Sequence, residues 1–148
     1  MNALVFTLLD IAGLIEKRFD RPLAGARGVS FREYRLLKSL SEFPGSRAMR
    51  VELAEAVGLT PSAVTRALKP LEKLGYVVTE KGERDARQSL ARLTEAGEIL
   101  LADADAIVAD VVAGLPAMSI SEGQLAELHR GLAGPAASRT VPLRAAIV

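Results

Sequence analysis

Apolar residues recur along most of the chain at intervals of three and four, the spacing of amphipathic helices, and predict a mainly helical protein. A first helix is expected over residues 2–19, where an apolar stripe is formed by Leu4, Leu8, Ile11, Ile15 and Phe19. Residues 20–29 contain Pro and Gly and predict a loop. Ser30, with Glu33 three residues later, is a capping-box pattern that predicts the start of a second helix, ending near residue 43.

The next helical pattern covers residues 51–57 and ends in a tight turn. Its apolar spacing is expected to bury one face of the helix, made of Val51, Leu53, Ala54 and Val57. Gly58 can adopt the positive φ that closes a helix. Leu59 is expected to fill the gap between this helix and the one that follows.

A further helix is predicted over residues 61–74, with Thr60 as its cap. A helix-turn-helix needs a small residue where its helices cross, a glycine-like turn four positions later, and an apolar anchor six beyond that. Ala54, Gly58 and Val64 meet these three conditions. An ordinary αα-hairpin also uses a glycine turn, so this alternative stays open on the three residues alone.

A charged hairpin is predicted directly after the two helices. Residues 76–79 are β-branched and aromatic, as in a strand, and residues 80–87 form a charged tip that contains Gly82. Residues 88–93 return as a second strand, for which Leu90 and Leu93 are the candidates to turn inward. A tip rich in Lys and Arg can reach a phosphate backbone or a minor groove. The alternative is a solvated hairpin whose charges only maintain solubility.

The helix-turn-helix and the hairpin together resemble those of the MarR family (multiple-antibiotic-resistance regulators). The matching segments are LAEAVGLTPSAVTRALKPLEKLGYV and DARQSLARLTEAG, and the close match spans roughly residues 47–101. The second segment carries the wing signature of the family, here Asp85, Arg87, Leu93, Thr94 and Gly97. The resemblance implies a winged helix-turn-helix, in which the short extended stretch 46–50 pairs with the wing as a third strand.

The predicted fold is a single domain over 1–148, with a winged helix-turn-helix unit at 30–93, dimerisation helices at 2–19 and 94–134, and a tail at 135–148. Thr94 can cap a long helix to about residue 114, and Ser121 with Gln124 begins a last helix to about residue 132. These terminal helices carry more apolar surface than a small winged unit can cover. The resemblance implies a homodimer in which they intertwine. A monomer that folds its helices onto itself is the alternative.

The charge of the chain is unevenly distributed. The net charge is only +1, which is too weak to indicate nucleic-acid binding by itself. Residues 46–92 hold nine Lys or Arg against six Asp or Glu, a net of +3, whereas residues 93–148 hold three against seven, a net of −4. A basic centre beside an acidic C-terminal part is consistent with a DNA-facing unit on an acidic scaffold.

Candidate DNA-binding residues lie on the outer face of the predicted helix 61–74. Ser62, Thr65 and Arg66 are expected to face base edges, and Arg66 could bind a guanine through two hydrogen bonds. Lys69 is expected to contact a phosphate. For each of them the plainer interpretation is a solvated surface group.

The wing adds four candidate DNA-binding residues. The resemblance implies that Arg87 enters the minor groove and that Asp85 steadies it. Arg84 and Lys81 would add contacts to the DNA backbone. These side chains, too, are otherwise ordinary surface charges.

The resemblance also implies an effector site, because members of the family bind small aromatic or phenolic anions between the dimer helices and the winged unit. The candidate polar groups near such a crevice are Arg32, Tyr34 and Arg35. A helix with two outward arginines is also what solubility alone would produce.

Other classes of function find little support in the sequence. The chain has no cysteine, which excludes disulfides and thiol-based sensing, and its single histidine, His129, cannot form a metal site alone. No catalytic residue, metal or cofactor is predicted. The N-terminus lacks a basic segment, and no apolar run is long enough to cross a membrane, so a cytoplasmic location is expected.

The favoured function is a sequence-specific transcriptional regulator, a repressor, that binds a pseudo-palindromic operator on double-stranded DNA as a homodimer. Release by a small aromatic ligand is part of this expectation. The alternative is a winged-helix module that binds another protein and has no specific DNA target.

Overall fold

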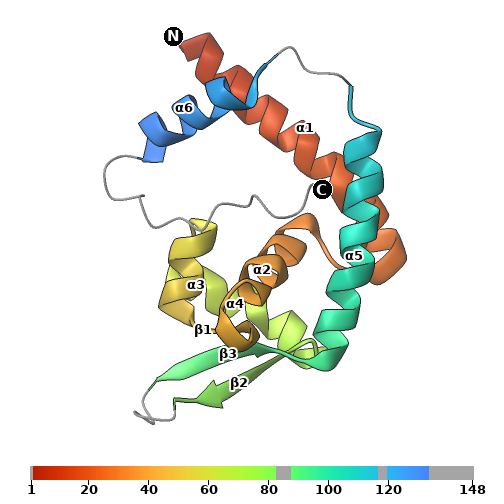
Figure 1. Ribbon diagram of the computed structural model, residues 1–148, viewed down its shortest axis with the longest axis vertical. Helices are drawn as coiled ribbons and strands as arrows, with labels where there is room; N and C mark the ends of the chain where they lie inside the picture. Colours follow the sequence, from red (N-terminus) through yellow and green to blue (C-terminus); the bar gives the residue numbers. More distant parts are fainter. Residues whose placement is uncertain (1, 83–87, 117–119, 134–148) are drawn as a thin grey trace.

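The computed structural model describes residues 2–82, 88–116 and 120–133 (Figure 1). This part of the chain has six helices and a small antiparallel sheet at one end of the molecule, which confirms the predicted fold class of a mainly α protein with a β-hairpin wing. The helices are α1 (Asn2–Arg27), α2 (Phe31–Ser41), α3 (Arg50–Val57), α4 (Pro61–Lys73), α5 (Glu95–Ala113) and α6 (Glu122–Ala133). A 3-10 turn (Pro44–Ser46) precedes the strands β1 (Arg47–Met49), β2 (Val77–Lys81) and β3 (Ser89–Leu93).

Local capping chemistry fixes where the helices begin and end. Ser30, Thr60 and Thr94 each accept a hydrogen bond through the side-chain oxygen from the backbone N–H three residues later, at 3.1, 3.2 and 3.1 Å. Gly58 ends α3 with a φ of 69°, the left-handed conformation that glycine adopts without strain. The predicted starts of α2, α4 and α5 are therefore confirmed.

The sheet places β3 between β1 and β2, and both pairings are antiparallel. The predicted third strand is confirmed, because Ala48 of β1 pairs with Ala91 of β3. The inward position predicted for Leu93 is confirmed, and the inward position predicted for Leu90 is wrong. Ala91 and Leu93 are the buried residues, and side chains alternate between the two faces of a strand, so Leu90 points to the opposite face.

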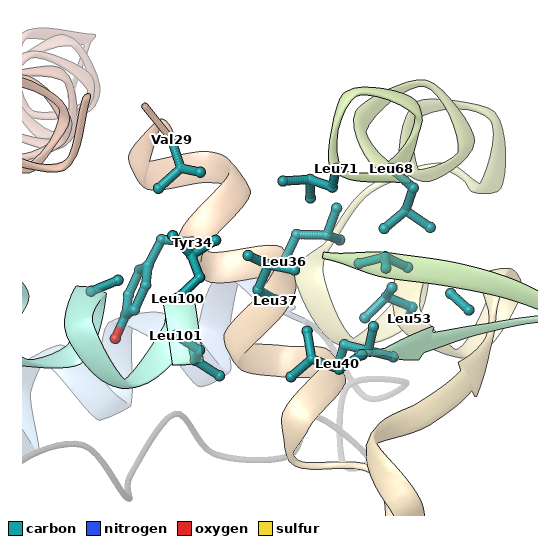
Figure 2. Close-up of a cluster of buried hydrophobic side chains, with 14 of the residues drawn as sticks. Val29, Tyr34, Leu36, Leu37, Leu40, Leu53, Leu68, Leu71, Leu100 and Leu101 are labelled. Atoms are coloured by element: carbon teal, nitrogen blue, oxygen red, sulfur yellow. The ribbon is translucent and has the colours of Figure 1, made fainter. Parts of the chain in front are cut away.

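An aliphatic core joins the winged unit to the scaffold helices (Figure 2). It is built from side chains of α2, α3, α4 and α5 that are almost completely buried, among them Leu36, Leu37, Leu40, Leu53, Leu68, Leu71, Leu100 and Leu101. In Figure 2 the leucines of α2 lie between those of α4 and those of α5. Helix α2 therefore packs against the helix-turn-helix on one side and against α5 on the other.

Two apolar residues of the predicted buried face of the helix-turn-helix are instead exposed. Val51 lies about 160° around the helix from Leu53, which is buried, so it cannot share that face. Leu59 keeps 48% of its surface exposed. Ala54 of α3 and Val64 of α4 are buried in the core instead.

Helix α1 is longer than predicted and includes most of the stretch expected to be a loop. It continues through Pro22 to Arg27 and ends where Gly28 takes a φ of 68°. Proline costs a helix one backbone hydrogen bond. Continuing the helix buries Phe19 and Leu23 one turn apart, and Leu23 is 0% exposed. That burial offsets the cost of the proline, which itself faces solvent.

Candidate nucleic-acid interface

Helix α4 has one apolar face and one polar face. Val64, Leu68 and Leu71 are buried in the core and hold the helix in place. On the other side the candidate DNA-binding residues Ser62, Arg66 and Lys69 are exposed, and Thr65 is half-buried. The Thr65 hydroxyl donates to the Pro61 carbonyl oxygen at 3.0 Å, which leaves lone pairs on its oxygen free to accept. The helix thus presents a fixed row of polar groups from its first turn onward.

The wing is a closed hairpin up to its last described residues. Gly82 donates its backbone N–H to the Gln88 carbonyl oxygen at 2.9 Å, which keeps the two strands in register. The candidate residue Lys81 ends β2 and is exposed. The candidates Arg84, Asp85 and Arg87 lie outside the described residues.

A partly buried arginine that the sequence analysis did not single out links the wing to α4. Arg50, the first residue of α3, donates to the Thr79 hydroxyl of β2 at 2.9 Å and to the Ser89 hydroxyl of β3. It also pairs with the Glu72 carboxylate of α4 at 3.3 Å. These partners are 22 to 39 residues away in the sequence, so no local pattern could have revealed them.

The base of the wing is joined to α5 by two residues of the wing signature, Thr94 and Gly97. The Thr94 hydroxyl accepts from the Gly97 N–H and donates to the Gly75 carbonyl oxygen at 2.6 Å. The Thr94 N–H in turn donates to the Tyr76 carbonyl oxygen at 3.0 Å. One threonine therefore caps α5 and ties it to the turn between α4 and β2.

Polar contacts connect α5 to α2 on the side away from the wing. The Tyr34 hydroxyl donates to Asp105 Oδ1 at 2.8 Å, and Lys38 pairs with Asp105 Oδ2 at 2.8 Å. Burial, together with the hydrogen bond to Asp105 and its negative charge, raises the pKa of Tyr34 above the ordinary value of 10.0. Tyr34 is therefore a neutral donor that holds α2 against α5.

The raised pKa of Tyr34 predicts a loss of stability in alkali. Below about pH 10 both the folded and the unfolded chain keep the phenol proton, so its stabilising effect is complete. Above that pH the unfolded chain releases the proton first, and the free energy of unfolding falls. We expect urea unfolding to show a steeper loss for wild type than for Tyr34→Phe above about pH 10. Parallel curves for the two proteins would contradict this assignment.

A pocket of about 510 Å³ lies between α1, α2 and the turn that joins α3 to α4. Its wall includes the predicted ligand residues Arg32 and Arg35, together with Glu16 and Leu59. Arg32 pairs with Glu16 at 3.2 Å. Tyr34 does not line this pocket, because its side chain points to the other side of α2, toward α5 (Figure 2). The structure thus brings together two of the three predicted residues.

The fold and the interface can be compared with known proteins. A sequence model of the MarR family matches residues 27–88. Sco3205, a MarR family transcriptional regulator from Streptomyces coelicolor solved in complex with DNA, is 30% identical, with a TM-score of 0.79. The similarity covers 89% of this chain and 85% of Sco3205. This chain belongs to the MarR family.

Other solved structures share this fold. The transcriptional regulator BldR from Sulfolobus solfataricus is 26% identical over 88% of this chain and 93% of its own, with a TM-score of 0.77. CouR from Rhodococcus jostii RHA1, solved with bound p-coumaroyl-CoA, is 25% identical over 88% of this chain and 89% of its own, with a TM-score of 0.72. No curated protein matches the sequence. The protein is thus a transcriptional regulator of the MarR family with a winged-helix DNA-binding fold.

In the part of this MarR regulator that the structure describes, no helix combines the length and the apolar composition that crossing a membrane requires. No group of three or more His, Asp or Glu side chains gathers there in a way that could hold a metal ion.

Proposed function

We propose that this MarR-family regulator binds a pseudo-palindromic operator as a homodimer and represses transcription. The observation that carries the proposal is the exposed polar face of α4, fixed by a buried apolar face and placed beside a three-stranded wing. The relative Sco3205 was solved with DNA, which favours the same partner here. A two-fold dimer would place its two α4 helices in successive major grooves, with half-sites about 10 base pairs apart.

Within this proposal each exposed group of α4 has a role set by its chemistry. Arg66 reads a base edge, because a guanidinium can donate two parallel hydrogen bonds to guanine. Ser62 and Thr65 reach bases or phosphates, and Lys69 contacts a phosphate as a point charge. In the wing Arg87 enters the minor groove, Asp85 steadies it, and Lys81 and Arg84 contact the backbone.

The proposed operator contacts predict a specific loss of affinity. We expect one duplex, among those tiled across the DNA around the gene of this protein, to bind far more tightly than the rest by fluorescence anisotropy. Arg66→Ala should weaken that complex by about 1–3 kcal/mol and relax its preference at one base pair. Arg87→Ala should weaken it and also make its salt dependence shallower.

The matched control is Arg21→Ala, which removes an exposed arginine from α1, away from α4 and the wing. It should bind the operator like wild type. If every duplex binds with the same low affinity and Arg66→Ala changes nothing, the DNA-binding proposal fails. The alternative, a winged-helix module for a protein partner, would then be preferred.

The homodimer part of the proposal is supported by apolar side chains that the single chain leaves exposed. In α1 they include Phe6 and Leu9, and in α6 they include Leu128 and Leu132. Isolated exposed leucines are ordinary, but a helix that is apolar on both faces is normally buried on both. A second copy of the chain is the partner that would cover them.

The effector part of the proposal places a small aromatic anion in the pocket at Arg32 and Arg35. The Arg35 guanidinium suits a carboxylate, beside Arg32 that is paired with Glu16, and the apolar wall of Leu36, Val57 and Leu59 suits a ring. The relative CouR was solved with an aromatic acyl-CoA ester. The pocket lies against the turn between α3 and α4, so a molecule bound there would act on the DNA-binding helices.

This site predicts release of DNA by phenolic acids. We expect p-coumarate or a related phenolic acid, titrated into the operator complex, to lower the anisotropy of the labelled duplex. Arg35→Ala should weaken that response while leaving operator affinity unchanged, since Arg35 lies away from α4's outer face. If a panel of phenolic acids leaves the complex intact and shows no heat of binding to the free protein, the effector proposal is wrong.

A further inference from the structure

The apolar attachment of the wing ends halfway along its strands. Residues that pair across β2 and β3 share a face, and on the inner face Val77 pairs with Leu93 while Thr79 pairs with Ala91. Val77, Ala91 and Leu93 are buried in the core. The next inner-face positions toward the tip are the polar residues Thr79 and Ser89. Beyond that point hydrophobic burial no longer holds the wing against the helices.

Beyond the end of the apolar contact, hydrogen bonds from Arg50 link the wing to the helices. Its guanidinium donates to one hydroxyl on each strand, Thr79 at 2.9 Å and Ser89, and to the Glu72 carboxylate at 3.3 Å. The Thr79 hydroxyl also donates to Glu72, so strand, arginine and helix form one closed network. The Arg50 side chain is only 20% exposed, so these bonds are partly shielded from water.

We propose that Arg50 is a positioning residue that fixes the wing relative to α4. Helix α4 is held by the core through Val64, Leu68 and Leu71, so the wing is the part that the Arg50 network orients. This inference rests on the proposed function, in which α4 and the wing bind the same duplex in adjacent grooves. A tilt of the wing would then move its tip out of the minor groove while α4 remains in place.

The same hairpin offers a matched control on its other face. Arg92 pairs with Glu80 at 2.5 Å, and their positions in the register place both on the outer face, away from α4. Both arginines are partly buried and both bond to a wing residue, but within the described residues only Arg50 also bonds to α4. A comparison of Arg50→Met with Arg92→Met therefore separates positioning from general support of the hairpin.

The first test needs no DNA. Hydrogen exchange of the free protein, followed by mass spectrometry, is expected to show faster exchange over 77–81 and 89–93 in Arg50→Met than in Arg92→Met. Exchange in α4 should stay as in wild type. Thermal unfolding confirms that both variants are folded at the assay temperature. If the strands of Arg50→Met exchange no faster than those of Arg92→Met, the proposed role is overturned.

The second test is a double-mutant cycle on operator affinity. Arg50→Met is expected to raise Kd about tenfold in wild type but less than about twofold in an Arg87→Ala background, since the minor-groove arginine that a misplaced wing would withdraw is already missing. In an Arg66→Ala background the factor should again be about tenfold. A factor of about ten in both backgrounds would instead mean that Arg50 contacts DNA directly or only stabilises the fold, and would overturn the proposal.

Failure of the DNA-binding function and failure of the Arg50 proposal give different results in these tests. If wild type binds no duplex, the proposed DNA function is wrong, and the exchange comparison alone decides whether Arg50 orients the wing. If wild type binds an operator and the cycle shows independent factors, the DNA function stands and Arg50 has no positioning role.

Discussion

Gly97→Ala is expected to destabilise the protein by about 3 kcal/mol, although it adds a single methyl group to a helix. In most helices this change is favourable, because glycine loses more conformational freedom on folding than alanine. Here an added Cβ would overlap the carbonyl oxygen of Tyr76 and lie 2.8 Å from Leu93 Cδ1. The leucine side chain can rotate, but the Tyr76 carbonyl belongs to the backbone and cannot.

Two hydrogen bonds from Thr94 hold the Tyr76 carbonyl and its neighbour in place. The Tyr76 carbonyl accepts from the Thr94 N–H at 3.0 Å, and Thr94 also donates through its hydroxyl to the Gly75 carbonyl oxygen at 2.6 Å. To make room for a methyl group, α5 would have to move away from the turn that begins β2. That movement would break the Thr94 bonds and expose Leu93, so the cost includes more than the local overlap.

Urea unfolding of wild type and Gly97→Ala provides the measurement, with Gly25→Ala as the control. Gly25 also lies in a helix, but an added Cβ there would meet nothing within 4 Å. That variant should be as stable as wild type, or more stable by up to about 1 kcal/mol. Equal stability of Gly97→Ala and wild type would show that α5 and the wing base do not approach this closely in solution.

Features of this chain that depend on neighbouring residues could be predicted from the sequence. The caps Ser30, Thr60 and Thr94 and the helix-ending Gly58 act within a few residues of themselves, and all four are confirmed. Each supplies a hydrogen bond or a backbone conformation that its own turn requires. The order and type of the elements follow from such signals.

Features that depend on distant parts of the chain could not be predicted. The continuation of α1 past Pro22 is decided by the burial of Leu23 against the rest of the fold, and α1 bonds there to α5 through Arg27 and Asp103. In the same way, Arg50 reads as an ordinary surface charge in the sequence, because its partners come from α4 and two strands. Propensity is a weak guide wherever tertiary contacts decide.

The wing motif shows what a family resemblance adds and what it leaves open. The resemblance pointed to Gly97 without a physical reason, and the structure supplies one, since a Cβ at this position of α5 would overlap the Tyr76 carbonyl at the wing base. Asp85 and Arg87 lie outside the described residues, so their DNA contacts stay proposals. Mutation of Arg87 is therefore the more informative test of function, and mutation of Gly97 the more informative test of fold.

The double substitution Phe6→Glu with Leu9→Glu is expected to dissociate the homodimer. The two side chains are 65% and 63% exposed in the single chain and lie more than two helical turns before the buried anchors of α1, Phe19 and Leu23. Charge buried there without a partner would cost more than the contact provides. The fold of each subunit should survive, because Phe19 and Leu23 are unchanged.

Light scattering after size-exclusion chromatography measures this directly. Wild type should have twice the mass of one chain, and the double variant the mass of one chain. Leu74→Glu is the control, since Leu74 is an exposed leucine at the end of α4, outside the proposed dimer helices. It should remain a dimer. A wild-type protein with the mass of one chain, or a double variant that stays dimeric, would rule out this interface.

Loss of the dimer should also weaken operator binding by at least about a hundredfold. In a dimer the second α4 is held near its half-site once the first has bound, and this linkage raises affinity by about 10²–10⁴ without new contacts. The monomer keeps every DNA-contacting residue but loses the linkage. Its residual affinity should therefore be the same for a full operator and for a single half-site, whereas wild type should strongly prefer the full operator. A monomeric variant that retains this preference would show that the two half-sites are not read by paired subunits.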